Sequence, residues 1–411
     1  MKWILITSLV LSVVFDAVLV VLNNLAARQP LPENVRDVYD EEEYQKFIRY
    51  RNDNKKLGTI KKTFEVAISL IFLISDLYAA VYQVLPGNEV SKTMLMLLVF
   101  EAISCVVSIP FEYYNTFVIE EKYGMNKSTR KTFFTDIIKQ FIIGIIVTGV
   151  LLALAMFLFV QFGNLGILFA VFVIAFLVIL VNLFSMKLMK IFNKFTPLEE
   201  GELRDSLQEL CDKYGMQVKA ISIMDASKRT TRANAFCAGI GNKKDISLDD
   251  NLVERYTTKQ IVAVFAHEFA HAKFKHMPKQ MLINILQIAL YVMIVGVILN
   301  FPQLFTAFGF KTINYYFALI LFGMIAWPIT AVVGLILNYF SRKCEYEADA
   351  FSAKEGYGAE LISALKQLSK DSLSNLNPHP VIVALEYSHP TISQRATAIE
   401  QVNKLGTVDD K

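Results

Sequence analysis

The sequence predicts a mainly α-helical protein that crosses a membrane several times and carries a polar domain with a small sheet on one side. Of its 411 residues, 54% are hydrophobic, against about 45–50% in a typical soluble domain. The excess is gathered in long apolar runs, and Lys and Arg concentrate in alternate loops between them. Two long polar stretches remain, which are enough for a folded domain outside the bilayer.

Seven apolar segments can cross a hydrocarbon core of about 30 Å, which takes about 20 helical residues. Pro328 lies inside the last of them and predicts a kink there. The first could instead be a signal peptide, but Asp16 interrupts it and no clear small-residue cleavage site follows, so we interpret it as a span. The seven segments are residues 3–22, 63–85, 94–118, 141–162, 167–187, 282–301 and 315–340.

The basic residues orient these spans. They are frequent in the loops 26–62, 120–140 and 190–280 and directly after the last span, whereas the intervening loops hold little more than Lys92 and Lys311. We therefore expect the N-terminus outside, with the large loop and the C-terminus in the cytosol.

This topology predicts a division of the chain into four parts. They are an N-terminal membrane domain of about five spans (1–190), a first polar part (191–280), two further spans (281–340) and a second polar part (341–411). Both polar parts face the cytosol and can form one domain. The patterns predict helices over 203–214, 360–376 and 393–405 and strands over 218–224 and 245–248.

Charge and cysteine content exclude other classes. The formal net charge of +3 is close to balance and predicts no nucleic-acid partner. The four cysteines include no C-x-x-C pair, so reduced thiols are expected and not a disulfide framework.

Residues 267–271 read His-Glu-Phe-Ala-His. On a helix His267 and His271 lie on one face, so their imidazole nitrogens can converge on one metal ion. A helix is expected because Thr257 and Gln260 can form a capping box ahead of it. Neutral imidazole suits Zn²⁺. The motif therefore predicts one zinc site, and the competing interpretation is a surface helix with solvated histidines.

Glu268 lies next to the first of these histidines and is the expected general base. Zinc lowers the pKa of a water that it holds to about 7. Glu268 can accept a proton as the water attacks a carbonyl and then pass the proton to the leaving amine. This arrangement predicts peptide hydrolysis without a covalent intermediate.

A catalytic zinc needs a third protein ligand. Directly after the last span, Glu345 and Asp349 lie four residues apart in a helical stretch. Glu345 could complete the zinc ligands, and Asp349 could accept a hydrogen bond from the other nitrogen of a ligand histidine. A solvated helix face is the alternative for both. Glu347 points to another face and is the weaker candidate, and His276 is expected at the surface or beside substrate.

These motifs resemble the integral-membrane zinc proteases of the type I CAAX prenyl protease family. The resemblance rests on His-Glu-Phe-Ala-His at 267–271, on Ser-Arg and Glu-Tyr-Glu-Ala-Asp-Ala from residue 341, and on the stretch 111–127. It implies a zincin-like metalloprotease domain, with Glu345 as the third zinc ligand and Asp349 as the partner of a ligand histidine. It also implies a water-filled chamber between the spans.

The resemblance implies further roles. Asn234 and His389 match residues near the reacting carbonyl, and the strand after Asn234 matches an edge that pairs with substrate backbone. Arg395 matches a residue near the site that handles substrate, although it could instead hold a structural acid. The expected substrate is a peptide or protein, namely a CAAX-type C-terminal tail of a prenylated protein.

The family resemblance leaves some alternatives open. Phe269 and Ala270 replace the more usual Leu-Gly, and the chain is short for a eukaryotic member. A bacterial inner membrane is therefore as acceptable a location as the endoplasmic reticulum, and membrane lipid is an expected partner in either. A broad-specificity protease for membrane quality control is the second functional hypothesis. A transporter or receptor with a structural zinc site is the third.

Overall fold

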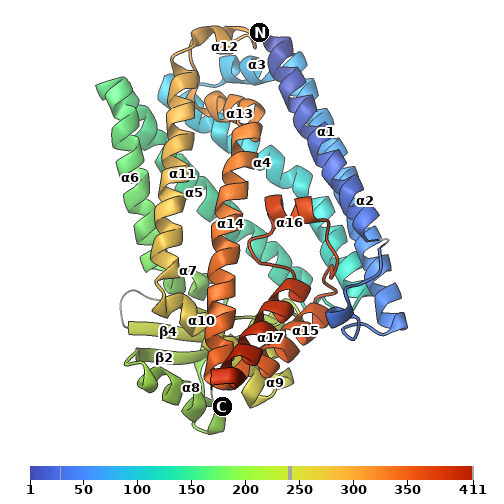
Figure 1. The fold of residues 1–411 in the computed structure, drawn as a ribbon. Helices are drawn as coiled ribbons and strands as arrows, with labels where there is room; N and C mark the ends of the chain where they lie inside the picture. The colour runs from blue at the N-terminus through green and yellow to red at the C-terminus, as the bar shows by residue number, and fades with distance from the viewer. Residues whose placement is uncertain (28, 239–242, 410–411) are drawn as a thin grey trace.

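The computed structural model describes residues 1–27, 29–238 and 243–409. Long helices run side by side along the molecule, and a small sheet lies at one end (Figure 1). The N-terminus lies at the end far from the sheet, whereas the last described helix, α17, lies at the same end as the sheet.

Within the described residues, five helices are long and apolar enough to cross a membrane, and two bent pairs raise the number to seven if each pair is one span. Only 11–17% of the residues in the most apolar windows of the five are buried inside the protein. Helices that are apolar and yet exposed need a lipid solvent. The five are α1 (Lys2–Ala26), α4 (Glu89–Tyr114) with the π-helix η2 (Asn115–Glu120), α5 (Arg130–Phe162), α6 (Asn164–Leu183) and α11 (His276–Leu299).

Each bent pair has a local cause. The sequence predicts one span over 63–85, but the structure divides this segment between α2 (Glu41–Ile74) and α3 (Leu77–Val84), which meet at 66°. Asp76 has a left-handed φ of 56° at the break, and that conformation ends a right-handed helix.

The other bend separates α13 (Tyr315–Ile325) from α14 (Trp327–Ser352) at 69°. Pro328 lies in the first turn of α14, where its missing N–H costs no helical hydrogen bond. The kink predicted at this proline is therefore present.

The sheet has four strands in the order β1-β2-β4-β3. β2 (Gln217–Met224) and β4 (Lys243–Asp249) are parallel, and β1 (Phe195–Pro197) and β3 (Ala235–Ala238) add to them antiparallel as the two edges. The sequence predicts β2, β4 and the helix α8 (Glu202–Lys213) to within a few residues. It does not predict β1, which is only three residues long.

The two polar stretches of the chain share one hydrophobic core. α10 (Thr258–Lys273) crosses this core between the sheet and the C-terminal helices. Phe269 of α10 is completely buried, and its ring stacks on that of Phe351 in α14 at a centroid distance of 5.8 Å. The core therefore fixes the end of α14 against α10, although two spans separate them in the sequence.

The C-terminal helices close the domain. α14 continues beyond its apolar part through the π-helix η4 (Ala353–Tyr357) into α15 (Gly358–Asp371). Two separate helices follow, α16 (Pro380–Glu386) and α17 (Ile392–Asp409). The remaining short elements are η1 (Glu33–Val35), α7 (Ser185–Phe192), η3 (Ala226–Lys228), α9 (Asp250–Arg255) and α12 (Pro302–Thr306).

The membrane helices are joined to the polar domain through the segment that follows η2. Asn126 forms an isolated bridge with Thr230. Arg232 contacts Glu120 at 3.2 Å, and Arg229 contacts Asp136 of α5 at 2.7 Å. These contacts hold the loop that leads into β3.

Candidate metal centre

The helix α10 forms where the sequence predicts it. The Thr257 side chain accepts from the Gln260 backbone N–H, and the Gln260 side chain accepts in return from the Thr257 N–H. This capping box satisfies two of the free donors at the helix start. Gln260 also donates to Ser363 of α15 at 3.0 Å, which ties the helix to the C-terminal part of the domain.

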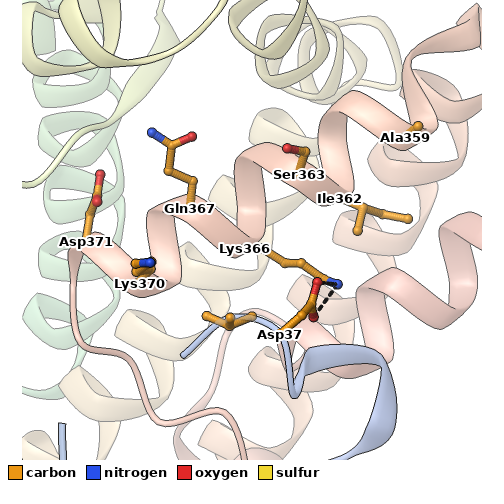
Figure 2. Close-up of a pocket in the computed structure, with 9 residues that line it drawn as sticks. Asp37, Ala359, Ile362, Ser363, Lys366, Gln367, Lys370 and Asp371 are labelled. Carbon is orange, nitrogen blue, oxygen red and sulfur yellow. Dashed lines mark hydrogen bonds and ion pairs between the residues drawn. The ribbon is translucent and has the colours of Figure 1, made fainter. Parts of the chain in front are cut away.

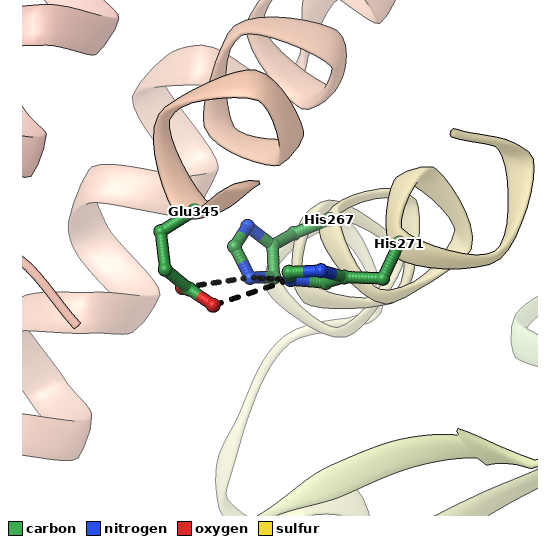
Figure 3. Close-up of side chains that lie close together, drawn as sticks. All are labelled: His267, His271 and Glu345. Atoms are coloured by element: carbon green, nitrogen blue, oxygen red, sulfur yellow. Dashed lines mark hydrogen bonds and ion pairs between the residues drawn. The ribbon is translucent and has the colours of Figure 1, made fainter. Parts of the chain in front are cut away.

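Three side chains converge between α10 and α14 (Figure 3). The Nε2 atoms of His267 and His271 lie 3.2 Å apart. The Glu345 carboxylate lies 3.4 Å from the first and 3.3 Å from the second. His267 and Glu345 are buried, and His271 is partly exposed. The two histidines come from consecutive turns of one helix. The glutamate comes from α14, and two membrane spans separate it from the histidines in the sequence.

The spacing of these atoms fits a zinc ion. In a tetrahedral site with bonds of about 2.0–2.1 Å, neighbouring ligand atoms lie about 3.3 Å apart. The 3.2 Å between the two Nε2 atoms matches that edge. The Glu345 carboxylate faces both nitrogens, with Oε2 3.4 Å from His267 and Oε1 3.3 Å from His271. Two imidazole nitrogens and one carboxylate also form a donor set that catalytic zinc sites use. His267, His271 and Glu345 would hold the metal.

His267 has a second partner on its other nitrogen. Its Nδ1 lies 2.9 Å from Asp349, and Arg395 donates to both Asp349 oxygens at 2.6 and 2.8 Å. All three side chains are buried. Burial and the Arg395 charge lower the pKa of His267, but hydrogen bonds to Asp349 and Glu345 outweigh them and raise it to about 9. The metal-free site therefore holds a proton that a metal ion has to displace.

Arg395 is only 6% exposed, and its guanidinium is bound to Asp349. This placement favours the role of holding a structural acid over direct contact with substrate. The sequence could not distinguish the two, because the burial of Arg395 depends on how α17 packs against α14.

We expect Arg395→Met to destabilise the fold by about 3–5 kcal/mol, because it leaves the buried Asp349 without its counter-charge. The thermal unfolding midpoint of the metal-free protein in detergent measures this loss. Arg204→Met, at an exposed position of α8, is the control. If Arg395 were chiefly a substrate ligand, the variant would keep its midpoint and only KM would rise.

His271 also has a partner, which the sequence did not reveal. Its Nδ1 lies 3.0 Å from Nδ1 of His276, and His276 Nε2 lies 3.0 Å from Glu347. The interpretation of His276 as a surface residue is wrong, because the residue is only 4% exposed. Lys275 adopts a left-handed φ of 56° and turns the chain so that α11 begins against α10. No Gly or Asn marks that turn in the sequence.

The remaining predicted residues surround the three ligands. Glu268 is half-buried, and within the described part of the chain its carboxylate has no hydrogen bond or ion pair, so it is free to accept a proton. His389 is 63% exposed, and its Nδ1 lies 2.8 Å from Glu345. Asn234 is exposed, and its side chain accepts from the N–H of Ala235. The structure brings His389 to the three ligands, but Asn234 has no hydrogen bond to them among the described residues.

β3 follows Asn234 directly and forms an edge of the sheet. It pairs with β4 on one side and packs against α10, which carries the two histidines. Within the described residues its other edge pairs with no strand, so it can accept an extended peptide.

A separate hollow of about 580 Å³ lies along α15 (Figure 2). Its lysines are already paired, Lys366 with Asp37 at 2.7 Å and Lys370 with Glu43 at 2.7 Å. None of its lining residues belongs to the metal centre. It is a polar junction between α15 and the loop before α2.

A helical membrane bundle that carries His-Glu-x-x-His and a distant glutamate on one centre defines a class, the multi-pass membrane metalloproteases. Two family models cover the chain. The model of the CAAX prenyl protease N-terminal domain with five membrane helices matches residues 21–194, and that of peptidase family M48 matches residues 197–403. The chain belongs to peptidase family M48, in the group of the type I CAAX prenyl proteases, and is a metalloendopeptidase.

Individual relatives agree. CAAX prenyl protease 1 of Saccharomyces cerevisiae is 30% identical, and the match covers 91% of this chain and 89% of that protein. The human CAAX prenyl protease 1 homolog is 26% identical over the same shares. The crystal structure of S. mikatae Ste24p superposes with a TM-score of 0.91 at 28% identity, covering 97% of this chain and 99% of the other. The predicted family and fold class are confirmed.

Proposed function

We propose that this protein is a zinc endopeptidase that uses one zinc ion per chain, bound by His267, His271 and Glu345. The observation that carries the proposal is the convergence of these three side chains, whose ligand atoms all lie within 4.8 Å of one another. A structural zinc site is usually closed by four protein ligands, whereas a catalytic site has three and an open position. Among the described residues only three side chains converge in this way, and a set of three favours an enzyme over a transporter or receptor with a structural metal.

The chain's own residues supply the proton transfers. A bound zinc ion would lower the pKa of a water molecule and polarise the substrate carbonyl. Glu268 lies beside the first ligand and has no hydrogen bond or ion pair among the described residues. It accepts the proton of the attacking water and donates it to the leaving amine. His389 carries a ring nitrogen that is not turned to Glu345 and can donate to the oxyanion, and Asn234 is the second candidate donor.

Other residues would bind the substrate backbone and orient the metal ligands. The free edge of β3 would pair with an extended substrate backbone next to the metal. Asp349 fixes the ring of His267, and Arg395 compensates the charge of Asp349. In this proposal β3 binds the substrate, α10 carries the residue that transfers the proton, and α14 and α17 orient the ligand His267.

For the substrate we propose the C-terminal CAAX-type tail of a prenylated protein, cut in a chamber enclosed by the spans. The names of the relatives support this substrate class. Glu101 and Glu112 are exposed within α4, and acids inside a span usually face a bundle interior or a wet cavity. A broad-specificity quality-control protease is the alternative, because the peptide-binding edge and the metal need no prenyl group.

The proposed site faces the cytosol, in the endoplasmic reticulum or a bacterial inner membrane. The support is the distribution of charge, since the loops on the side of the sheet carry most of the Lys and Arg residues. Surrounding membrane lipid is the solvent of the exposed apolar helix faces.

The substrate is tested with a farnesylated CAAX peptide and its unprenylated twin, each incubated with the purified protein in detergent. We expect cleavage of the farnesylated peptide and little of the twin. Equal cleavage of both would favour the quality-control protease. A protein that holds zinc and cuts neither peptide would contradict the proposed activity.

A further inference from the structure

Both histidine ligands have a buried partner on the nitrogen that faces away from the metal position, but the partners differ. His267 contacts a carboxylate directly, with its Nδ1 2.9 Å from Asp349. His271 contacts another histidine, His276, with the two Nδ1 atoms 3.0 Å apart. His271 is also connected to a carboxylate, but through His276, because His276 Nε2 lies 3.0 Å from Glu347.

The contacts of His271 allow one arrangement of protons in the metal-loaded state. His271 Nε2 faces His267 and Glu345, so it needs a free lone pair to bind a metal. The neutral ring then carries its proton on Nδ1 and donates to His276 Nδ1, which has to accept. His276 therefore carries its own proton on Nε2 and donates to the Glu347 carboxylate. In this arrangement each ring nitrogen between His271 and Glu347 has a hydrogen-bond partner. The opposite arrangement would place a proton on the metal-binding nitrogen of His271.

The backbone between α10 and α11 turns so that His276 contacts His271. Lys275 has a φ of 56°, a left-handed conformation that residues other than glycine adopt only at a cost in free energy. The turn brings the start of α11 back against the end of α10, and the rings of His271 and His276 pack edge to face at 5.0 Å. His276 is 4% exposed, whereas the side chain of Glu347 is 43% exposed. The series of contacts thus leads from the partly exposed ligand His271 through the buried His276 to the surface of α14.

We propose that His276 and Glu347 are a positioning pair that holds His271 in the tautomer and orientation needed for zinc. The inference rests on the proposed metal site and deepens it. Outer partners of this kind typically contribute 10–100-fold to metal affinity, because they fix the ligand ring and increase its basicity. Both residues act through His271 and are not themselves among the three proposed ligands.

Two substitutions of His276 separate positioning from packing. His276→Phe keeps an aromatic ring of similar volume but removes the acceptor for His271. His276→Asn loses the ring but can retain an acceptor oxygen near the former Nδ1. At Glu347, Glu347→Gln keeps an acceptor for His276, whereas Glu347→Ala removes it. Glu400→Gln, at an exposed position of α17, is the control.

The measurement is the zinc dissociation constant of each purified variant, obtained by competition with a chelator, together with the visible spectrum of the cobalt-loaded protein. We expect His276→Phe to weaken zinc binding about 10–100-fold and to shift the cobalt spectrum, and Glu347→Ala to weaken binding to a smaller degree. His276→Asn and Glu347→Gln should each restore affinity to within a few fold of the unmodified protein. Such rescue by an acceptor would not follow from a purely structural role.

The proposal is overturned if His276→Phe binds zinc as tightly as the unmodified protein, or if His276→Asn loses as much affinity as His276→Phe. Failure of the metal site itself gives a different result. In that case the unmodified protein would bind no zinc, or His271→Ala would bind it equally well.

Discussion

Glu268→Gln is expected to slow peptide hydrolysis strongly and to leave one zinc ion bound per chain. The amide has nearly the shape of the carboxylate but cannot accept the proton of the attacking water. A positioned general base typically contributes 10²–10⁴-fold, so kcat should fall by about that factor. Because Glu268 is half-buried and has no ion pair within the described residues, its neutralisation should leave the fold intact.

Turnover of a fluorogenic peptide and zinc content by mass spectrometry, measured on the same preparation, test this expectation. Glu254→Gln is the matched control, since it makes the same change at an exposed position of α9 in the same domain. A Glu268→Gln variant that hydrolyses peptide at the normal rate would show that another group accepts the proton.

Glu345→Gln is expected to remove the zinc and reduce hydrolysis to background. Glu345 lies between the two histidines and also contacts His389 at 2.8 Å and Arg395 at 3.7 Å. Its neutral replacement is a poor zinc ligand and leaves the metal two histidines, so activity should fall roughly a thousandfold or more. The loss should be larger than for any residue that only orients a ligand.

Zinc content after dialysis against a weak chelator measures this effect, with Glu360→Gln at the start of α15 as the control. The unfolding midpoint of the metal-free variant shows whether the protein still folds. A folded Glu345→Gln protein that retains a full equivalent of zinc would require a different third ligand.

The parts of this structure that the sequence predicts are those with a local signal. An apolar run predicts the span 141–162. The capping box and the four-residue spacing of His267 and His271 predict α10. Glu345 could be proposed because it follows a span in a helical stretch, although only the three-dimensional packing brings it to the histidines.

The parts that escape prediction depend on contacts between distant segments or on unmarked turns. Asp76 and Lys275 both adopt left-handed conformations that Gly would usually mark, so neither the bend after α2 nor the return of His276 onto His271 is visible in the sequence. Arg395 is charged and lies on a polar helix, which favours the surface, yet the packing of α17 against α14 buries it on Asp349.

X-ray absorption at the zinc edge of the purified protein in detergent tests the central claim most directly. We expect one zinc ion per chain, surrounded only by nitrogen and oxygen at about 2.0–2.1 Å, with the scattering pattern of two imidazoles. The Glu345→Gln protein should lose that signal. Sulfur at about 2.3 Å would place the metal on cysteine and contradict the His267, His271 and Glu345 centre, as would a protein that binds no zinc at all.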